Sequence, residues 1–497
     1  MNKKKRIVLV RPKANEKEKL IVTPLSLLTV AAPLEREGYD IKIVDSDLEA
    51  NYIEKILEYS ENAICVGITS ITGYQISDGL KISKAIKKKF PKLPIVWGGW
   101  HATVAPKETA ANPYIDVAVK GQGEVTFQEL VYAFEKNKSI DKIKGIAFKK
   151  KGKVVMNPLR PFEDLNKFPP IPYHLIDVEK YIEARPERER TIEYRSSQGC
   201  PFHCNFCAES CMTGMRWSGL KAERVVGELE NLVKKYNIES ILFFENNFFL
   251  DKERVRKISK GILKKKLKIK MRNMNARVNG FNNFEPELMR LIKKAGVRDI
   301  LIGAESGNQK VLDLINKRIK VEDIIETKRI CNKYGMMPFV SLMTGFPFEE
   351  VPFEEEFNDT LNLVEKFQEF DNNNFFFINI YLSYPGTELH EYGLKKGLEK
   401  KKSLEEWAKF DLTTKNPWVP EGYEKKIEHI NNYVIRIPTK RSERDWEALS
   451  NNPLLKKFFV FTHKVLSRTA KLRLKYRFFD FPVEYRFLKL ISPAMKS

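Results

Sequence analysis

The sequence contains no uninterrupted run of about 18 apolar residues, so we expect no membrane-spanning helix. Glycine and proline, at 25 residues each among 497, are too few for a fibrous or disordered chain. The basic start of the chain, Met1–Arg6, leads into a short strand-like segment and not into the apolar core of a signal peptide. Hydrophobic residues make up 42%, which favours two or three globular domains.

Cysteine is scarce as well, with six residues in the chain. So few cysteines in a chain of this length do not make a disulfide framework. Three of them, Cys200, Cys204 and Cys207, lie within eight residues, which is typical of metal binding in a reducing compartment. We therefore expect a cytoplasmic protein.

Acidic residues are in the minority, with 65 Asp and Glu against 87 Lys and Arg and a net charge of +22. A surplus of this size favours anionic partners, such as RNA, an anionic lipid surface or an acidic substrate. Lysine runs at 264–266 and 400–402 leave a second interpretation open, in which the charge reflects a generally lysine-rich composition.

Short apolar runs alternate with helical patterns over residues 1–145. The expected strands are 7–10, 41–45, 63–68, 94–97 and 115–119, and the expected helices include 24–37 and 77–90. This α/β pattern predicts a doubly wound parallel sheet. Ligands of such sheets bind beyond the carboxyl ends of the strands, where Ser70, Gly98, Gly99 and Gly121–Glu124 fall.

Three further regions follow. Residues 146–187 are expected to be a linker with a small hairpin, because prolines are frequent there. Residues 188–410 repeat the strand–helix order, with strands near 192–196, 240–244, 269–274, 299–302, 339–343 and 376–382. Six such units predict a partial (β/α)6 barrel, open relative to the eight-unit barrel. Residues 411–497 are expected to form a separate, mostly helical extension.

The cysteines follow the spacing C-x3-C-x2-C at Cys200, Cys204 and Cys207. Three thiolates on one loop can hold three irons of a [4Fe–4S] cluster and leave the fourth iron open, whereas electron-transfer clusters use four cysteines. An open iron can chelate the amino and carboxylate groups of S-adenosylmethionine (SAM). Zinc is the alternative, but zinc sites favour two separated C-x2-C pairs. Cys211 is either a fourth ligand or a bystander thiol, and we favour the bystander.

Four segments after expected strands accompany the cysteine motif. They are Phe244-Glu245-Asn246-Asn247-Phe248, Gly303-Ala304-Glu305-Ser306-Gly307, Gly345-Phe346-Pro347 and Tyr384-Pro385-Gly386-Thr387-Glu388-Leu389. In this order they resemble the radical SAM superfamily, in the class with an N-terminal B12-binding-like domain. That class includes the anaerobic Mg-protoporphyrin cyclase and hopanoid and other lipid-modifying enzymes. The resemblance covers residues from about 5 to 400.

The resemblance implies roles for several residues. The backbone of Phe206 would contact the adenine of SAM, and Glu305 would bind its ribose or amino group. Glu245 stands where the family has an acidic segment that holds the SAM amine, although Asn246 and Asn247 replace the other acids. Arg277 would pair with a carboxylate. Cleavage of SAM would give a 5′-deoxyadenosyl radical that acts on an unactivated carbon, by methylation, cyclisation or carbon–carbon coupling.

Cobalamin is the third cofactor that the resemblance implies. Family members use loops that correspond to Ser70, Gly98, Gly99, His101, Gly121, Gly123 and Glu124 around the nucleotide tail of cobalamin. The D-x-H-x-x-G motif, whose histidine coordinates cobalt in many B12 proteins, is absent, since Arg11-Pro12-Lys13-Ala14-Asn15 follows the first strand. His101 is either near the cofactor or, as we favour, a surface or capping residue. The domain is alternatively a scaffold without cofactor.

The last 47 residues, 451–497, hold eleven basic residues and two acidic ones, interleaved with aromatic residues. This pattern suits an anionic membrane surface, on which the protein would lie peripherally at the inner face. RNA, which we do not expect as a partner, and a helical lid over the barrel are the alternatives.

Family and tail together favour a lipid or isoprenoid as the small-molecule substrate, and the cluster requires a reductant such as flavodoxin or ferredoxin. A tRNA methylthiotransferase is discounted, because it needs three further cysteines in the N-terminal domain, which has only Cys65. A non-enzymatic corrinoid or iron–sulfur binding protein is the remaining alternative.

Overall fold

The computed structural model describes residues 5–16, 18–184, 189–410 and 416–491. The predicted boundaries at 187/188 and 410/411 and the last basic residue of the tail, Lys496, lie outside the described residues. The chain forms two compact units. The first comprises 1–246, 261–269 and 383–414, and the second 247–260, 270–382 and 415–497. The expected domain boundaries stay predictions.

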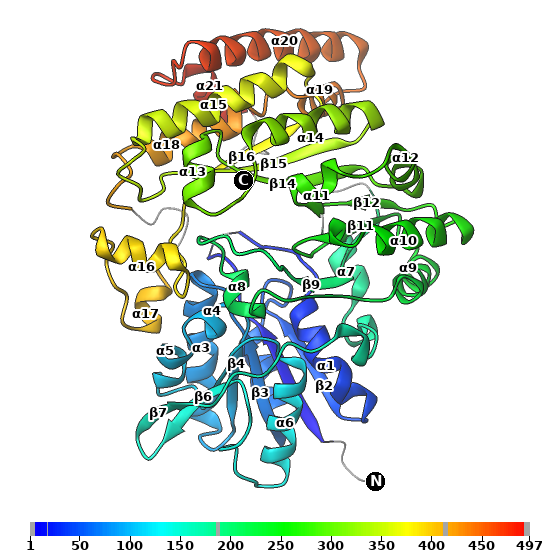
Figure 1. Cartoon of the computed structure of the whole chain (residues 1–497). Coiled ribbons are helices and arrows are strands. Elements are labelled where there is room, and N and C mark those ends of the chain that lie inside the picture. Colours follow the sequence, from blue (N-terminus) through cyan, green and yellow to red (C-terminus); the bar gives the residue numbers. More distant parts are fainter. Residues whose placement is uncertain (1–4, 17, 185–188, 411–415, 492–497) are drawn as a thin grey trace. The chain divides into compact units, whose positions relative to one another are not determined.

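A seven-stranded sheet dominates the N-terminal part of the first unit (Figure 1). Its order is β2-β1-β3-β4-β5-β6-β7, and its first strands are β1 (Arg6–Arg11), β2 (Asp40–Asp45), β3 (Ala63–Thr69), β4 (Ile95–Gly98) and β5 (Val117–Val119). Every pair from β2 to β5 is parallel, as predicted. The order reverses between β1 and β3, which puts the switch point of the fold at the carboxyl ends of these two strands.

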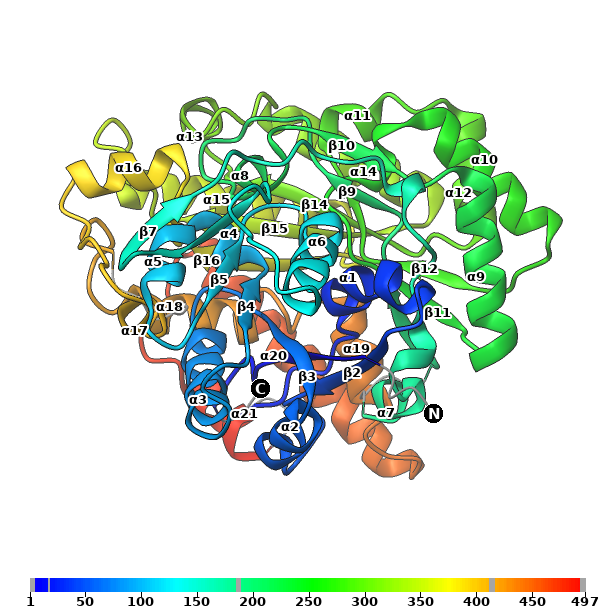
Figure 2. The same cartoon turned by 90° about the horizontal axis from the view of Figure 1, so that it is seen from below.

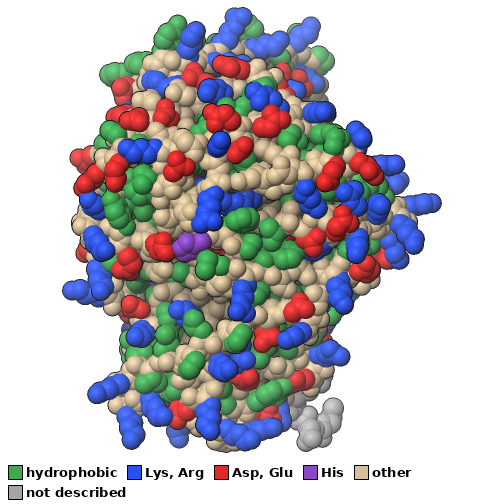
Figure 3. Space-filling view, in the orientation of Figure 1, with side chains coloured by type: hydrophobic (Ala, Val, Ile, Leu, Met, Phe, Trp, Pro, Cys, Tyr) green, Lys and Arg blue, Asp and Glu red, His purple; other side chains and the backbone are tan. Residues whose placement is uncertain are grey.

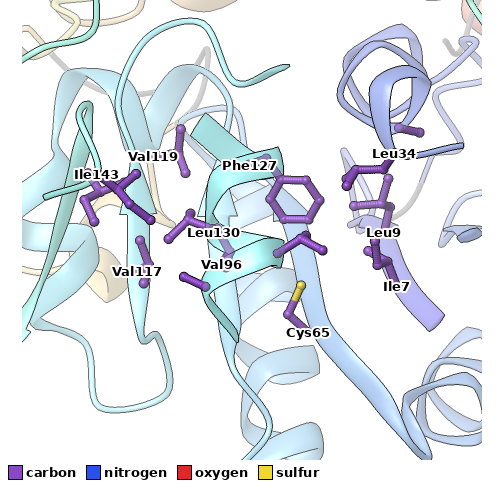
Figure 4. Close-up of a cluster of buried hydrophobic side chains, with 14 of the residues drawn as sticks. Ile7, Leu9, Leu34, Cys65, Val96, Val117, Val119, Phe127, Leu130 and Ile143 are labelled. Atoms are coloured by element: carbon purple, nitrogen blue, oxygen red, sulfur yellow. The ribbon is translucent and has the colours of Figure 1, made fainter. Parts of the chain in front are cut away.

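Helices cover both faces of this sheet, because its central strands β1 and β3 are apolar on both sides. Figure 2 shows α1 (Leu25–Arg36) and α6 (Glu124–Glu135) on one side and α2 (Tyr52–Ser60) and α3 (Tyr74–Lys89) on the other. The core under α1 and α6 contains Leu9, Leu34, Cys65, Val96 and Phe127 (Figure 4). A Cβ at Gly67 would lie 2.8 Å from Leu9 and 3.1 Å from Phe127, so this strand position has to be glycine for α6 to pack closely.

The hairpin expected within the linker belongs to the sheet instead. Strand β6 (Ile146–Lys150) pairs antiparallel with β5, and β7 (Lys153–Met156) pairs antiparallel with β6. The physical reason is apolar burial, since Ile146 and Phe148 are buried in one cluster with residues of α6, and Ala147 between them is buried as well. The prolines on which the linker prediction rested come after the hairpin.

The cysteine motif lies between two parallel strands of the first unit. Strand β8 (Thr191–Tyr194) pairs with β11 (Ser240–Phe243), and α9 (Ala222–Tyr236) connects them. A small antiparallel hairpin of β9 (Ser197–Gly199) and β10 (Trp217–Gly219) frames the motif and was not predicted. Its two strands are only three residues long, which is too short for a periodic pattern to appear in the sequence.

The second unit contains a parallel sheet with the order β13-β14-β15-β16. The strands are β13 (Met274–Ala276), β14 (Asp299–Glu305), β15 (Met337–Thr344) and β16 (Phe375–Ile380), with α12 (Pro286–Ala295), α14 (Val321–Tyr334) and α15 (Phe353–Phe370) between them. The predicted strand 269–274 is broken into β12 (Lys270–Arg272) and β13. Asn273 adopts a left-handed conformation there, with φ of 56°, and its N–H donates to Asp299.

The C-terminal region is mostly helical, as predicted. It contains α18 (Tyr423–His429), α19 (Lys440–Glu447), α20 (Pro453–Lys475) and α21 (Val483–Ile491) (Figure 1). Within the described part of the chain, no helix combines the length and the apolar character needed to cross a bilayer.

Candidate functional site

The three predicted cluster cysteines lie on one compact loop. Cys200 follows β9 directly, Cys204 is buried, and Cys200 and Cys207 are partly exposed. The N–H of Cys207 donates to the carbonyl of Cys204 (3.0 Å), and the hydroxyl of Ser210 donates to the carbonyl of Cys207 (3.0 Å). These hydrogen bonds fold the loop into a tight turn that ends in α8 (Glu209–Thr213).

The donor set fits a cluster better than a single ion. Among the described residues, no three His, Cys, Asp or Glu side chains are grouped in a way that would hold one metal ion. A cubane cluster does not require such convergence, because each thiolate binds a different iron. Three thiols spread over one loop therefore match the cluster chemistry.

The Tyr384–Leu389 segment, distant in sequence, packs against this loop in the first unit. The N–H of Leu389 donates to the carbonyl of Asn205 (3.0 Å), and Glu388 pairs with His203 (2.9 Å). The thiol of Cys211 donates to the carbonyl of Gly386 (2.9 Å). Burial raises the pKa of the Cys211 thiol, which favours a protonated side chain. Both features support the bystander role predicted for Cys211.

Glu245, at the end of β11, anchors the entry to the loop. One carboxylate oxygen accepts from the N–H (3.1 Å) and the hydroxyl (2.7 Å) of Ser196, and the other accepts from the hydroxyl of Ser197. The side chain is buried. Glu245 thus holds the backbone that leads into Cys200, a role that its sequence context did not suggest.

Glu209, which was not predicted from the sequence, is the first residue of α8 and directly follows the cysteine loop. Burial raises the pKa of its carboxyl to about 7, against lowering contributions from a hydrogen bond to Asn246 and from the charge of Arg195. Arg195 in turn faces Glu124 at 3.5 Å. No motif marks Glu209 or Arg195, and the pairing of β8 with β11 brings the ends of these strands, which carry Arg195 and Asn246, side by side.

One of the loops predicted for cobalamin, Gly121–Glu124, contacts the strand that enters the cysteine loop. The side-chain amide of Gln122 donates to Gln198 (3.4 Å), two residues before Cys200. The N–H of Gly121 donates to Thr103 (3.0 Å), and a Cβ at Gly121 would lie 3.5 Å from the carbonyl of Met212. The carboxyl end of the N-terminal sheet therefore lies directly beside the cysteine loop within the first unit.

A pocket of about 520 Å³ opens between these loops. Its lining comprises Thr103, Val104, Lys120, Gly121, Gln122, Leu159, Arg160, Pro161, Phe162, Ser210, Cys211, Met212, Thr213, Gly214, Arg216 and Gly386. Lys120, Arg160 and Arg216 are its charged members, so the pocket favours an anionic group. Of the residues predicted to bind cobalamin, Gly121 alone belongs to this lining.

The remaining predicted cobalamin residues are tightly packed, with one exception. Ser70 is buried and its N–H donates to the carbonyl of Gly98 (2.9 Å), while a Cβ at Gly99 would lie 2.8 Å from the carbonyl of Ser70. Gly123 packs against Val30 of α1. Gly98 is the exception, since a Cβ there would meet no atom within 4 Å. The end of β4 thus leaves open space at Gly98.

His101 is not a surface residue, which corrects the favoured prediction. It is fully buried, its ring packs on Trp407 (5.8 Å between centroids), and its Nδ1 pairs with the hydroxyl of Thr72 (3.1 Å). Burial lowers the pKa of His101 to about 3, so the ring is neutral. Its Nε2 has no hydrogen-bond partner in the structure. Trp407 covers the ring, so this geometry does not support a role near cobalamin.

A network of charges joins the carboxyl ends of β1 and β2, next to the segment in which many B12 proteins carry the cobalt-binding histidine. Arg11 donates two hydrogen bonds to Asp45 (2.8 and 2.9 Å) and faces Asp47 at 3.3 Å. All three residues are buried. These residues fit a corrinoid held without a protein histidine on cobalt, and they do not fit one that requires this ligand.

The predicted residues Arg277 and Glu305 lie in the second unit and meet at a residue that the sequence reading missed. Glu305, at the end of β14, forms a buried ion pair with Lys317, and Arg277 donates to the carbonyl of Lys317. A Cβ at Gly303 would lie 2.6 Å from the Glu305 carboxylate and 3.0 Å from the Lys317 ammonium. The first glycine of Gly303–Gly307 therefore makes room for the ion pair.

The Gly345-Phe346-Pro347 segment follows the next strand, β15, and surrounds another buried glutamate. The N–H of Gly345 donates to Glu356 (3.2 Å), and Trp418 donates to the carbonyl of Gly345 (2.6 Å). Phe346 stacks on Tyr381 at 5.0 Å. Burial raises the pKa of Glu356 to about 8, against lowering contributions from backbone hydrogen bonds.

Comparison with known proteins agrees with this geometry. A model of the radical SAM superfamily matches residues 194–364, and a model of the B12 binding domain matches residues 15–131. An uncharacterized methyltransferase of Pyrococcus horikoshii is 33% identical over 402 residues, which cover 79% of this chain and 84% of the relative. The chain belongs to the radical SAM superfamily. Membership assigns it a [4Fe–4S] cluster and SAM, and the B12-binding domain assigns it cobalamin.

Two more distant radical SAM relatives differ in their reactions. The anaerobic magnesium-protoporphyrin IX monomethyl ester cyclase of Synechocystis is 24% identical over 335 residues, 66% of this chain and 65% of the relative. The hopanoid C-3 methylase of Methylococcus capsulatus is 22% identical over 374 residues, 74% of this chain and 68% of the relative. The solved structure of the cobalamin-dependent SAM radical enzyme OxsB shares the fold, with a TM-score of 0.76 at 16% identity over 98% of this chain and 75% of that chain.

Proposed function

We propose that the protein is a cobalamin-dependent radical SAM enzyme that transfers a methyl group to an unactivated carbon. The observation that carries this proposal is the contact of the Gly121–Glu124 loop with Gln198, at the entry to the cysteine loop. A corrinoid held on the carboxyl end of the N-terminal sheet would lie beside the cluster. Such proximity is what radical methylation requires, because the methyl donor and the carbon radical have to meet in one site.

In this proposal Cys200, Cys204 and Cys207 each bind one iron. When bound, the cluster supplies the electron that cleaves SAM to a 5′-deoxyadenosyl radical, and cobalamin supplies the methyl group. The backbone of Phe206 contacts the adenine. Glu245 acts on the loop itself, since its hydrogen bonds to Ser196 and Ser197 fix the direction of the backbone that leads into Cys200.

The second unit contributes the charged groups. Glu305 binds the ribose or the amino group of SAM, and Arg277 pairs with a carboxylate. In the ligand-free chain Lys317 neutralises Glu305. A ribose hydroxyl or the amino group of SAM would bind the same carboxylate while Lys317 stays its ion-pair partner, so neither buried charge is left unpaired.

Cobalamin is held by backbone rather than by a metal ligand. The space beyond Gly98 and the backbone of Gly99 and Gly121 form the proposed contact surface. Ser70, Gly123 and Glu124 support these loops from behind. His101 is not a cobalt ligand in this proposal, because Trp407 covers its ring.

The proposal for the substrate and the partners rests on the basic C-terminal residues 451–497 and on the relatives. We propose a lipid or isoprenoid substrate, in line with the hopanoid methylase among the relatives, and peripheral attachment to the inner, cytoplasmic face of a membrane. The reductant is an acidic protein such as flavodoxin or ferredoxin. Nucleic acid is not a partner.

Cyclisation, oxidation or carbon–carbon coupling on a cofactor-free scaffold domain is the second candidate. The observation that favours it is the buried Arg11–Asp45 pair at the carboxyl ends of β1 and β2, in a chain whose segment after β1 has no cobalt-binding histidine. The cyclase relative points in the same direction. A purely corrinoid- or cluster-binding protein without activity is not supported, because the family consists of enzymes.

One experiment separates these candidates. Protein made with hydroxocobalamin is reconstituted anaerobically with iron and sulfide, reduced with dithionite and given SAM. We expect bound corrinoid without a histidine ligand in its spectrum, 5′-deoxyadenosine and, with a lipid extract and methyl-labelled SAM, label in the lipid fraction. 5′-Deoxyadenosine without corrinoid would favour the second candidate. Absence of 5′-deoxyadenosine in a protein that holds its cluster would contradict both.

A further inference from the structure

Helix α20 has two apolar faces, and only one of them is used by the fold. His463, Leu466, Ala470 and Leu474 are buried. His463 hydrogen-bonds the carbonyl of Ile437 (2.9 Å), and Tyr433 donates to the carbonyl of Leu466 (3.1 Å). These contacts fix the helix on the second unit and determine which side faces outward.

The outward side carries large apolar side chains in a continuous stripe, which we call the outer stripe. It consists of Leu454 (78% exposed), Phe458 (60%), Phe461 (67%), Val465 (45%) and Leu472 (53%). The intervals of four, three, four and seven residues put all five on one side of an α-helix. Exposed apolar side chains are ordinary when scattered, but a contiguous set marks a binding surface.

The apolar surface continues after the helix. Phe478, Phe481, Val483 and Phe487, in the turn and in α21, are all at least half exposed. Figure 3 shows hydrophobic and basic side chains close together over the region that Figure 1 labels α20. The surface is therefore wider than a single helix stripe.

Within α20, the charge next to the outer stripe is positive only. Helix α20 contains seven Lys and Arg residues and no Asp or Glu. One of the seven, Arg473, is buried and paired with Glu484. Lys457, Lys464, Arg468, Lys471 and Lys475 are exposed, and helical periodicity puts them along one flank of the outer stripe. A binding partner has to offer an apolar layer bordered by negative charge.

We infer that the outer stripe docks the enzyme on an anionic lipid bilayer, with α20 parallel to the membrane plane. The apolar side chains enter the boundary of the acyl chains, and the basic flank meets the headgroups. This inference deepens the proposed function, on whose lipid substrate it rests, by naming the surface that would bring the site to its substrate.

Two other occupants fit the surface less well. A second copy of the chain would bring two basic flanks together with no acid on α20 to neutralise them, and like charges at an interface oppose association. RNA would satisfy the basic flank, and its bases could stack on Phe458 and Phe461, but the aliphatic side chains Leu454, Val465 and Leu472 of the same stripe would gain nothing from it. A bilayer satisfies both the apolar and the basic part.

The test uses the full-length, reconstituted protein and vesicles of phosphatidylcholine with or without phosphatidylglycerol. We expect co-sedimentation with the anionic vesicles that weakens as salt rises, and little with phosphatidylcholine alone. The double variant Phe458→Glu, Phe461→Glu should lose at least about tenfold in apparent affinity, because each charge opposes both the apolar insertion and the anionic surface. The matched control is Leu20→Glu, Met156→Glu, which changes two exposed apolar residues of the first unit.

A second pair of variants tests the charge. Lys457→Ala, Lys464→Ala, Arg468→Ala should weaken binding at least about tenfold, whereas Lys84→Ala, Lys88→Ala, Lys92→Ala, which removes three exposed lysines from the first unit, should leave it within about twofold. Equal loss in both triple variants would mean that only the net charge matters and would overturn the docking surface.

Other results are equally decisive. Dimers of wild type that the Phe458→Glu, Phe461→Glu variant lacks, with no vesicle binding, would identify a second copy as the occupant. Binding of RNA in place of vesicles would overturn the inference as well. Formation of 5′-deoxyadenosine in solution should be the same in wild type and stripe variants, so a protein that binds vesicles without cleaving SAM would contradict the proposed function and not the docking surface.

Discussion

A buried glutamate lies at the end of each of two neighbouring strands, and the two differ in what surrounds them. Glu305 is the last residue of β14, whereas Glu356 belongs to α15 and contacts the segment after β15. Glu305 faces the ammonium of Lys317, whereas Glu356 accepts from the N–H of Gly345 and has no cation among the causes that shift its pKa. A buried carboxylate next to a cation can hold its charge, while one among backbone donors in an apolar setting favours the neutral form. From this comparison we expect ligand binding at Glu305, as proposed above, and support of the loop by Glu356.

Loss of a cluster ligand is expected to have the largest effect on activity. Without the cluster SAM is not cleaved, and the proposed difference between Glu305, which binds SAM, and Glu356, which does not, has no consequence for the reaction. The Cys204→Ala protein should hold no intact cluster after anaerobic reconstitution and form no 5′-deoxyadenosine. Iron and sulfide content and product formation measure this. Cys211→Ala is the matched control and should keep both, so loss of the cluster in that variant would contradict the open-iron assignment.

Lys317→Met would make the end of β14 resemble the end of β15. We expect a loss of about 3–5 kcal/mol in the free energy of unfolding, because the change leaves the Glu305 carboxylate buried without its cation. Urea unfolding measures this. The double variant Lys317→Met, Glu305→Gln should recover most of the loss, since no charge then remains. A single variant as stable as wild type would show that the ion pair is not as buried as the structure has it.

Glu356→Gln would test whether the folded protein favours the neutral, protonated carboxyl of Glu356. The folded-state pKa of about 8 lies above the ordinary value of 4.5, so its contribution to stability is complete below about pH 4.5 and is lost as the pH rises through 8. The glutamine variant lacks this loss. We expect it to be more stable than wild type by roughly 5 kcal/mol at pH 9 and by about 1 kcal/mol at pH 5. Glu355→Gln, at the exposed neighbouring position, should show no such pH dependence.

The smallest expected effect concerns SAM itself. Glu305→Ala should weaken SAM binding to the reconstituted protein at least about tenfold while the cluster stays intact, since a charge-assisted hydrogen bond is lost. Glu356→Gln should change it less than about twofold. Equilibrium dialysis under anaerobic conditions measures both. Equal effects would remove the distinction between the two strand ends.

The sequence was sufficient to predict the succession of strands and helices along the chain and to find the cysteine motif. Strands and helices of the N-terminal sheet leave periodic patterns in the sequence, and C-x3-C-x2-C needs no structure to be seen. All six strands predicted after residue 188 have counterparts, but the third is interrupted at Asn273. That break depends on Asp299, which lies 26 residues away, and no local pattern contains it.

The contacts around the site could not be predicted from local patterns in the sequence. Lys317 meets Glu305 only because the segment after α13 (Gln309–Leu314) returns to the end of β14. His101 looked like an exposed residue after a glycine pair, yet Trp407, some 300 residues later, buries it. Each of these contacts joins segments whose spacing in sequence carries no signal, so only the folded chain reveals them.

Gly199, the residue directly before Cys200, has a consequence for genetic screens. Its φ is 90°, and a Cβ there would lie 2.1 Å from the carbonyl of Arg216, so no other residue fits between β9 and β10. A mutational scan that selects for an active enzyme would therefore rank Gly199 with the three cysteines, although glycine offers iron no side chain. Intolerance to substitution at this position reports the shape of the hairpin and gives no information about ligation.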